Sequence, residues 1–441
     1  MLQQVITLRT LAPVPLLAFV IAAHGRPLPA QQVIELPTED RPLDAGFEEV
    51  FRIGTITGES WQMLGTVRNV AFDGDGNLYL FDGTGGVTGP WLDPRILVYD
   101  AAGGFVREVG RSGEGPGEFS SPMSMVVMRD GATAVNDIGH RGFQLFDAAG
   151  GFLRIVRMTA GGFPLVFATQ VAADPRGGGI YATVPPARAG TIGGPAPPTT
   201  VSRPIVRLDL GGGVAVIDTV AEGWLPPPPE TADDEVPGVV IEGRPVTFSQ
   251  LGRGQSAVFA PELLMDVLPY GRVVFSDSSG YALKITGGGG GPVERAVVRS
   301  FEPQRVTPAI EEAEKERREA LRGALGGGGR TRMVEVRGRG GEVQSTTYEL
   351  PEPVFYPELS VIHALAATWE GRIWVQRRGE YPETDGHIDV LTPAGDYVGT
   401  FPAGTTALPD AFGPNGLAAF IVLDEMDVAT VVVRRLPAAV R

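Results

Sequence analysis

Few residues in this chain of 441 are of types and at spacings that could support chemistry. The segment Asp73-Gly-Asp-Gly-Asn77 places oxygen ligands at alternate positions, as a calcium-binding loop does. An EF-hand loop also needs glycine at its sixth position and an acid at its twelfth, where this chain has Leu78 and Thr84. Because Asp-Gly is also a common hairpin signal, we interpret the segment as a turn, with calcium binding as the alternative.

Residue counts limit the chemistry further. The absence of cysteine excludes disulfides, thiol catalysis and Cys-ligated zinc. His140, His363 and His387 lie in different segments, and no His-x-x-x-His pattern predicts a zinc site. A net charge of -15 argues against binding to nucleic acid. We therefore predict no cofactor, with calcium or zinc as alternatives, and we assign no catalytic or metal-binding residue.

A sequence repeat indicates which elements position these residues. Asp100-Ala-Ala-Gly-Gly-Phe-Val-Arg107 recurs as Asp147-Ala-Ala-Gly-Gly-Phe-Leu-Arg154. Before each copy come an apolar strand, a glycine turn and a second apolar strand that ends in aspartate. Six such blocks can be aligned: Asn69–Asp82, Ser124–Asp137, Gln170–Thr183, Met265–Asp277, Ala364–Arg377 and, more divergent, Gly416–Asp424. Each is followed by further β-type segments, and about four strands per repeat are typical of propeller blades.

The predicted fold class is therefore all-β, a six-bladed β-propeller with one short helical insertion. A β-type segment at 48–53 precedes the first block, and we expect it to complete the last blade, which hides exposed strand edges. The helix is expected within an insertion at about 303–350, with Thr307 as N-cap and Pro308 at the first helical position. Pro-rich loops are expected at 190–198 and 224–237.

The segment Gly110-Arg-Ser-Gly-Glu-Gly-Pro-Gly-Glu-Phe119, followed by Pro122, Asp130-Gly131 and Asp137, resembles an NHL repeat. The resemblance covers about 100 residues as a motif and most of the chain as architecture. It implies an exported bacterial six-bladed β-propeller. Arg377 departs from the repeat, because aspartate is usual at that strand end.

The first 30 residues are predicted to be a secretory signal peptide. Arg9 precedes an apolar stretch at 11–23, and small residues lead to Ala30, the preferred cleavage point. Residues 31–45 would then form an N-terminal linker and residues 46–441 the propeller. We expect a periplasmic or secreted monomer with no membrane span after cleavage.

A candidate ligand site follows from the positions of the turn glycines. Counting back seven or eight residues from each glycine reaches the start of an inner strand, near one mouth of the central channel. The polar residues found there, or close by, are Arg68, Asn69, Ser124, Gln170, Asp266 and His363. A mixed polar ring could bind a small polar ligand or support acid–base catalysis, and a hydrated channel lining is the alternative.

The recurrent Asp82, Asp137 and Asp277 are expected to be structural, accepting turn N–H groups or pairing with nearby basic residues. For the whole chain we predict a binding module that presents its loop-decorated face to a protein, peptide or glycan. The alternative is a metal-assisted hydrolase or lyase with its site at the central channel, by fold-level analogy with NHL-type amidating lyases and propeller lactonases.

Overall fold

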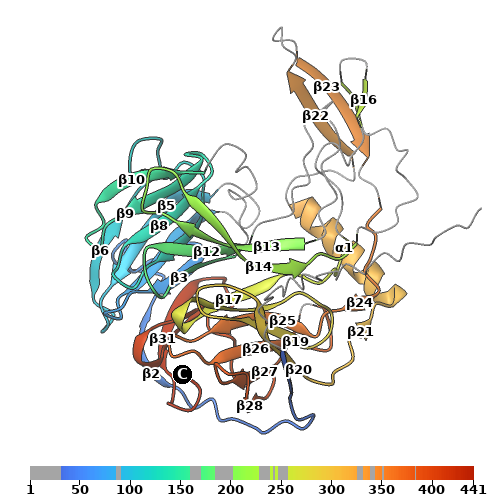
Figure 1. Cartoon of the computed structure of the whole chain (residues 1–441). Helices are drawn as coiled ribbons and strands as arrows, with labels where there is room; N and C mark the ends of the chain where they lie inside the picture. The colour runs from blue at the N-terminus through green and yellow to red at the C-terminus, as the bar shows by residue number, and fades with distance from the viewer. Residues whose placement is uncertain are drawn as a thin grey trace, which may run out of the picture. The chain divides into compact units, whose positions relative to one another are not determined.

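Short apolar strands separated by glycine turns form six antiparallel sheets of four strands, one of which gains a fifth. Each sheet is one blade, and Figure 1 shows the blades following one another in chain order, from blue to red. The computed structural model describes residues 31–85, 91–158, 170–183, 202–227, 239–241, 244–246, 257–324, 331–337, 343–349, 352–382 and 384–441. The predicted signal peptide, the loop at 190–198 and most of the loop at 224–237 lie outside these residues. The predicted six-bladed propeller is confirmed.

The strands of the first three blades follow chain order. Blade one consists of β3 (Asn69–Phe72), β4 (Leu78–Gly85), β5 (Trp91–Tyr99) and β6 (Phe105–Val109). Blade two consists of β7 (Pro122–Val127), β8 (Thr133–Asp137), β9 (Gly142–Phe146) and β10 (Phe152–Arg157). Blade three consists of β11 (Val171–Ala173), β12 (Gly179–Thr183), β13 (Ser202–Asp209) and β14 (Val216–Trp224).

The last three blades include the N-terminal strands. Blade four consists of β17 (Leu264–Leu268), β18 (Arg272–Ser276), β19 (Ala282–Thr286) and β20 (Val293–Val298), with β1 (Gln32–Glu35) added. Blade five consists of β25 (Ile362–Ala367), β26 (Ile373–Arg378), β27 (Asp385–Leu391) and β28 (Tyr397–Phe401). Blade six consists of β29 (Ala411–Phe412), β30 (Leu417–Leu423), β31 (Ala429–Arg435) and β2 (Glu48–Ile53).

The first strand after each linker is the innermost strand of its blade. Strand β3 lies against β7 and β29, while β17 lies against β11 and β25, so neighbouring inner strands meet around the axis. Successive blades repeat the same up-and-down order, and the first residues of the inner strands therefore gather on one side of the ring. We call this the strand-start side.

The hydrophobic core is divided among the seams between blades. Six buried clusters are found, and each joins two neighbouring blades. Alternate residues of an inner strand enter opposite seams, as strand geometry requires. In β17, Leu264 and Leu268 pack toward blade five, whereas Met265 packs toward blade three. The same alternation determines which seam each polar residue faces.

The N-terminal segment holds three blades together. Strand β2 pairs antiparallel with β31, which confirms that the first strand of the ring completes the last blade. Within the segment expected to be a linker, β1 pairs in parallel with β20 of blade four. Between them, Pro42 forms a parallel bridge with Thr400 in blade five. Residues 31–53 therefore contact blades four, five and six.

The insertion begins as predicted with helix α1 (Pro308–Ala324), whose Ile310 N–H donates to the Thr307 hydroxyl at 3.4 Å. Paired short strands accompany it: β21 (Gln304–Arg305) with β24 (Glu358–Leu359), and β22 (Thr331–Arg337) with β23 (Val343–Glu349). Elsewhere, β15 (Val239–Ile241) pairs with β16 (Arg244–Val246), and the short 3-10 helices are η2 (Pro269–Gly271) and η3 (Pro414–Gly416). No helix in the described ranges is long and apolar enough to cross a membrane.

The glycine-rich block between blades one and two is explained by one aromatic ring. Phe119 is fully buried and packs edge-to-face against Phe81 and Phe146. Gly110 has a φ of 76°, and a Cβ there would lie 2.2 Å from the Phe119 ring. Only glycine fits this close approach and this left-handed conformation.

Candidate functional site

The aspartates that end the second strands are structural, as predicted. In blade one, Asp82 accepts the Gly65 N–H at 2.9 Å and forms an ion pair with Arg95, also at 2.9 Å. Asp137 accepts the N–H groups of Ser120 and Ser121. Asp277 accepts the N–H of Trp224 and forms an ion pair with Lys284. These carboxylates hold the linkers that precede the inner strands.

The Asp73 segment is a turn in which the aspartate is fully engaged. Its Oδ1 accepts the N–H groups of Asp75 and Asn77 at 3.0 and 2.9 Å. Its Oδ2 accepts the Asn77 side-chain amide at 2.7 Å and the Tyr79 hydroxyl at 3.3 Å. Burial, with help from the Asp73 carboxylate, raises the pKa of Tyr79 to about 12. Both Asp73 oxygens therefore stabilise the hairpin.

Three of the predicted site residues are structural equivalents. Asn69, Ser124 and Gln170 each lie seven residues before a turn glycine with positive φ, which places them at the same level on blades one, two and three. By strand alternation, each side chain faces the following blade. Gln170 uses this position structurally, because its Oε1 accepts the N–H of Met265 in blade four at 2.9 Å.

Asn69 and Ser124 differ from Gln170 in leaving polar atoms unused. Asn69 Oδ1 and Ser124 Oγ are buried, and neither finds a hydrogen-bond partner in the described part of the chain. Such atoms are rare in folded proteins because each costs about 1–3 kcal/mol. Arg68 comes directly before Asn69, the first residue of β3, and burial lowers the pKa of Arg68. We call Arg68, Asn69, Ser124 and Gln170 the mouth arc.

His363 lies near the start of β25 in blade five, within a separate group of charges. Its Nε2 is 3.7 Å from Asp385 Oδ1, and Glu262 and Arg378 also act on it electrostatically. Burial, reinforced by Arg378, lowers the pKa of His363 below its usual 6.5, so the imidazole is neutral at pH 7. The count from turn glycines did not find Glu262 and Asp385, because neither residue lies at the start of an inner strand.

The structure separates Asp266 from the other candidates. It lies five residues before its turn glycine, which places it about 7 Å deeper than the mouth arc at about 3.3 Å per residue. Its Oδ1 accepts the Val267 N–H at 2.7 Å, and its Oδ2 accepts the N–H of Ala367 in blade five at 2.6 Å. Asp266 therefore joins two inner strands, and both of its oxygens are used in doing so.

Burial raises the pKa of Asp266 from 3.8 to about 6, against the lowering effect of its two N–H donors. The folded protein thus holds a proton at this carboxyl between about pH 4 and 6, where the unfolded chain has released it. Because the folded state binds more protons in this window, Asp266 makes the protein less stable as the pH rises through it. A carboxyl with such a pKa near the axis could also act as an acid or base.

Blade five reverses the charge pattern of blades one and four, in which the second strand ends in an aspartate that pairs with a base of the third strand. Arg377 occupies the strand end where aspartate is usual, and Asp389 lies opposite Val375, as Lys284 lies opposite the equivalent residue in blade four. Arg299 binds Asp389 at 2.9 Å and Asp40 at 2.7 Å, and both side chains of the Arg299–Asp389 pair are fully buried. Arg377 also binds Asp40, at 2.7 Å.

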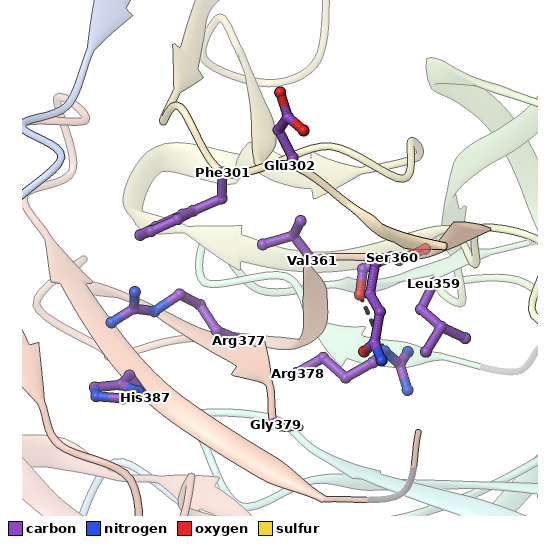
Figure 2. Close-up of a pocket in the computed structure, with 10 residues that line it drawn as sticks. Phe301, Glu302, Leu359, Ser360, Val361, Arg377, Arg378, Gly379 and His387 are labelled. Atoms are coloured by element: carbon purple, nitrogen blue, oxygen red, sulfur yellow. Dashed lines mark hydrogen bonds between the residues drawn. The ribbon is translucent and has the colours of Figure 1, made fainter. Parts of the chain in front are cut away.

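A cavity of about 240 Å³ lies beside this ion network, on the strand-start side between blades four and five (Figure 2). Its walls include Arg377, Arg378 and His387 together with Phe301. The sequence marked Arg377 as a departure from the repeat, but it contained no signal for the cavity itself. Among the described residues, no group of three or more His, Asp or Glu is arranged to hold a metal ion.

The fold and these sites define a six-bladed β-propeller. No protein-family model and no curated protein matches the sequence. Solved structures with a similar fold include a protein assigned as exported from Bacteroides fragilis, with 12% identity, coverage of 92% of this chain and 100% of that chain, and a TM-score of 0.48. Regucalcin from Agrobacterium tumefaciens has 13% identity, coverage of 92% and 97%, and a TM-score of 0.35.

A gluconolactonase from Xanthomonas campestris has 12% identity, coverage of 85% and 87%, and a TM-score of 0.32. The propellers with a similar fold thus include an exported protein and an enzyme. At these identities the similarity concerns the fold, and it assigns no site or activity to this chain.

Proposed function

We propose that this protein is an exported binding module that holds a protein, peptide or glycan over the strand-start side of the propeller. The observation that carries the proposal is a pair of polar atoms on neighbouring blades, Asn69 Oδ1 and Ser124 Oγ, that have no hydrogen-bond partner among the residues the structure describes. The equivalent Gln170 oxygen is occupied by a backbone N–H. A bound ligand with hydroxyl or amide groups would supply the missing partners.

The second candidate is a metal-assisted hydrolase or lyase with its site near the axis. One observation favours it, namely the raised pKa of Asp266. Both Asp266 oxygens, however, already accept backbone N–H groups, which gives the carboxylate a structural role. The binding proposal therefore ranks first.

The proposed location is the periplasm or the exterior of the cell, after removal of residues 1–30, and the proposed state is a monomer. The support for this location is the leader-like sequence, in which Arg9 precedes an apolar stretch at 11–23 and small residues lead to Ala30. The location also agrees with ligands that are peptides or glycans, while the net charge of -15 disfavours nucleic acid as a partner.

Saturation-transfer NMR with the mature protein tests the proposal. The probes are cellohexaose, chitohexaose and a mixture of unmodified pentapeptides, and elemental analysis is performed on the same chelator-free sample. We expect saturable binding of at least one probe class by a protein without a stoichiometric metal. Stoichiometric metal without binding of any probe would contradict the binding module and favour the hydrolase or lyase.

A further inference from the structure

The cavity between blades four and five has an apolar wall and a basic wall. Phe301, Leu359 and Val361 form the apolar wall, and Arg377, Arg378 and His387 form the basic wall. We call this cavity the seam pocket. It is separate from the mouth arc, which lies on blades one to three. A ligand of the seam pocket is therefore independent of the function proposed above.

Arg377 presents an unsatisfied donor at the basic wall. Its Nη2 binds Asp40, and its guanidinium lies over the Phe301 ring at 4.8 Å. Its Nε is buried and finds no acceptor within the described ranges, and the side chain as a whole is only 10% exposed. A buried cationic N–H without an acceptor is unfavourable, and an anion is the acceptor that satisfies it best.

The strand end beside the linker in front of blade five lacks the carboxylate that blades one, two and four provide. The Gly65 and Ser120 amides, each eleven residues before a turn glycine, donate to Asp82 and Asp137. Ser360 is at the same distance from its turn glycine, but the corresponding strand end carries Arg377. The seam pocket therefore has a cationic donor, Arg377, at the strand end where three other blades carry an acidic acceptor.

The acidic side chain that lines the seam pocket does not pair with Arg377, so it does not take the place of a bound anion. Figure 2 shows the Glu302 side chain pointing away from Arg377 and Arg378. Arg378 donates to the Ser360 carbonyl at 3.0 Å and to the Pro382 carbonyl. Thus Glu302, the carboxylate that lines the cavity, does not pair with Arg377 from inside it (Figure 2).

We propose that the seam pocket binds a carboxylate that carries a small apolar or aromatic group. The carboxylate accepts from Arg377 Nε, and the apolar group packs against Phe301 and Val361 (Figure 2). A cavity of about 150 Å³ can already hold benzene, so the 240 Å³ of the seam pocket is enough for a ring and a carboxylate. The ligand class is thus a small aromatic or branched organic acid, free or at the end of a larger molecule.

Fluorine NMR with 4-fluorobenzoate tests this assignment on the intact mature protein. Its neutral isostere 4-fluorobenzamide is the matched control ligand and requires no substitution. We expect saturable binding of the acid below about 10 mM and binding of the amide at least about tenfold weaker. Equal binding of acid and amide, or no saturable binding of the acid, would overturn the proposal.

Two substitutions locate the bound acid. Val361→Phe fills the seam pocket without changing a charge, and Arg377→Gln removes the cationic donor; each is expected to weaken binding at least about tenfold. Arg52→Gln removes an exposed arginine of blade six and should leave binding unchanged. Ser124→Ala should also leave it unchanged, which separates this site from the mouth arc. If Val361→Phe folds and binds the acid normally, the seam pocket is not the site.

Discussion

Alanine substitutions at Ser124 and Gln170 should change stability differently, although the two residues are structural equivalents. Gln170→Ala removes the acceptor of the Met265 N–H at 2.9 Å and leaves a part-buried donor unpaired. The expected loss is about 1–3 kcal/mol. Ser124→Ala removes a buried hydroxyl that has no partner in the described structure, so stability should stay the same or rise by up to about 1 kcal/mol.

Urea unfolding of both variants measures this difference in the free energy of unfolding. The comparison requires that the free energy fall with urea concentration at the same slope in each variant. Ser60→Ala, at an exposed position of the same residue type, is the control and should change nothing. A loss greater than about 1 kcal/mol in Ser124→Ala would show that the hydroxyl is hydrogen-bonded within the folded protein. That result would refute the reasoning that assigns Ser124 to a ligand.

Three further predictions concern the axis and the N-terminal segment. Asp266→Asn removes the titrating carboxyl, so the fall in stability of about 3 kcal/mol that this group causes between about pH 4 and 6 should disappear; equal effects of the substitution on urea unfolding at both ends of that window would contradict it. Arg299→Met removes the fully buried partner of Asp389 and leaves Arg377, at 3.5 Å, as the remaining cation beside it; the substitution should cost about 3–5 kcal/mol, part of which the double variant with Asp389→Leu recovers; a loss below about 1 kcal/mol would count against the buried pair. Deletion of residues 31–46 removes β1 and Asp40 and should speed amide exchange in β20 but not in β6; unchanged exchange in β20 would show that this segment does not hold blade four.

Much of the architecture was predictable because it repeats. Glycine turns at a regular distance from apolar strands located five blades well and the sixth approximately. The closure of the ring by residues 48–53 followed from the need to cover strand edges. The structural role of Asp82 and its equivalents was predictable for the same reason, since a residue that recurs in several blades performs a task common to those blades.

The candidate site was only partly predictable, because it depends on contacts between blades. The count from turn glycines found Asn69 and Ser124, but it could not show that their oxygens lack partners while that of Gln170 is bound. It placed Asp266 near the mouth, although a shift of two strand positions puts this residue deeper and in contact with blade five. The seam pocket is lined by blade five and by the segments on both sides of the insertion, and no local sequence pattern brings these together.

The most direct test of the binding module is calorimetric titration of the probe that binds in the NMR screen against two proteins. One is the wild type, and the other is the double variant Asn69→Ala, Ser124→Ala. The account predicts that the double variant is at least as stable as the wild type and binds at least about tenfold more weakly. Unchanged affinity in a folded double variant would contradict a ligand site at the mouth arc.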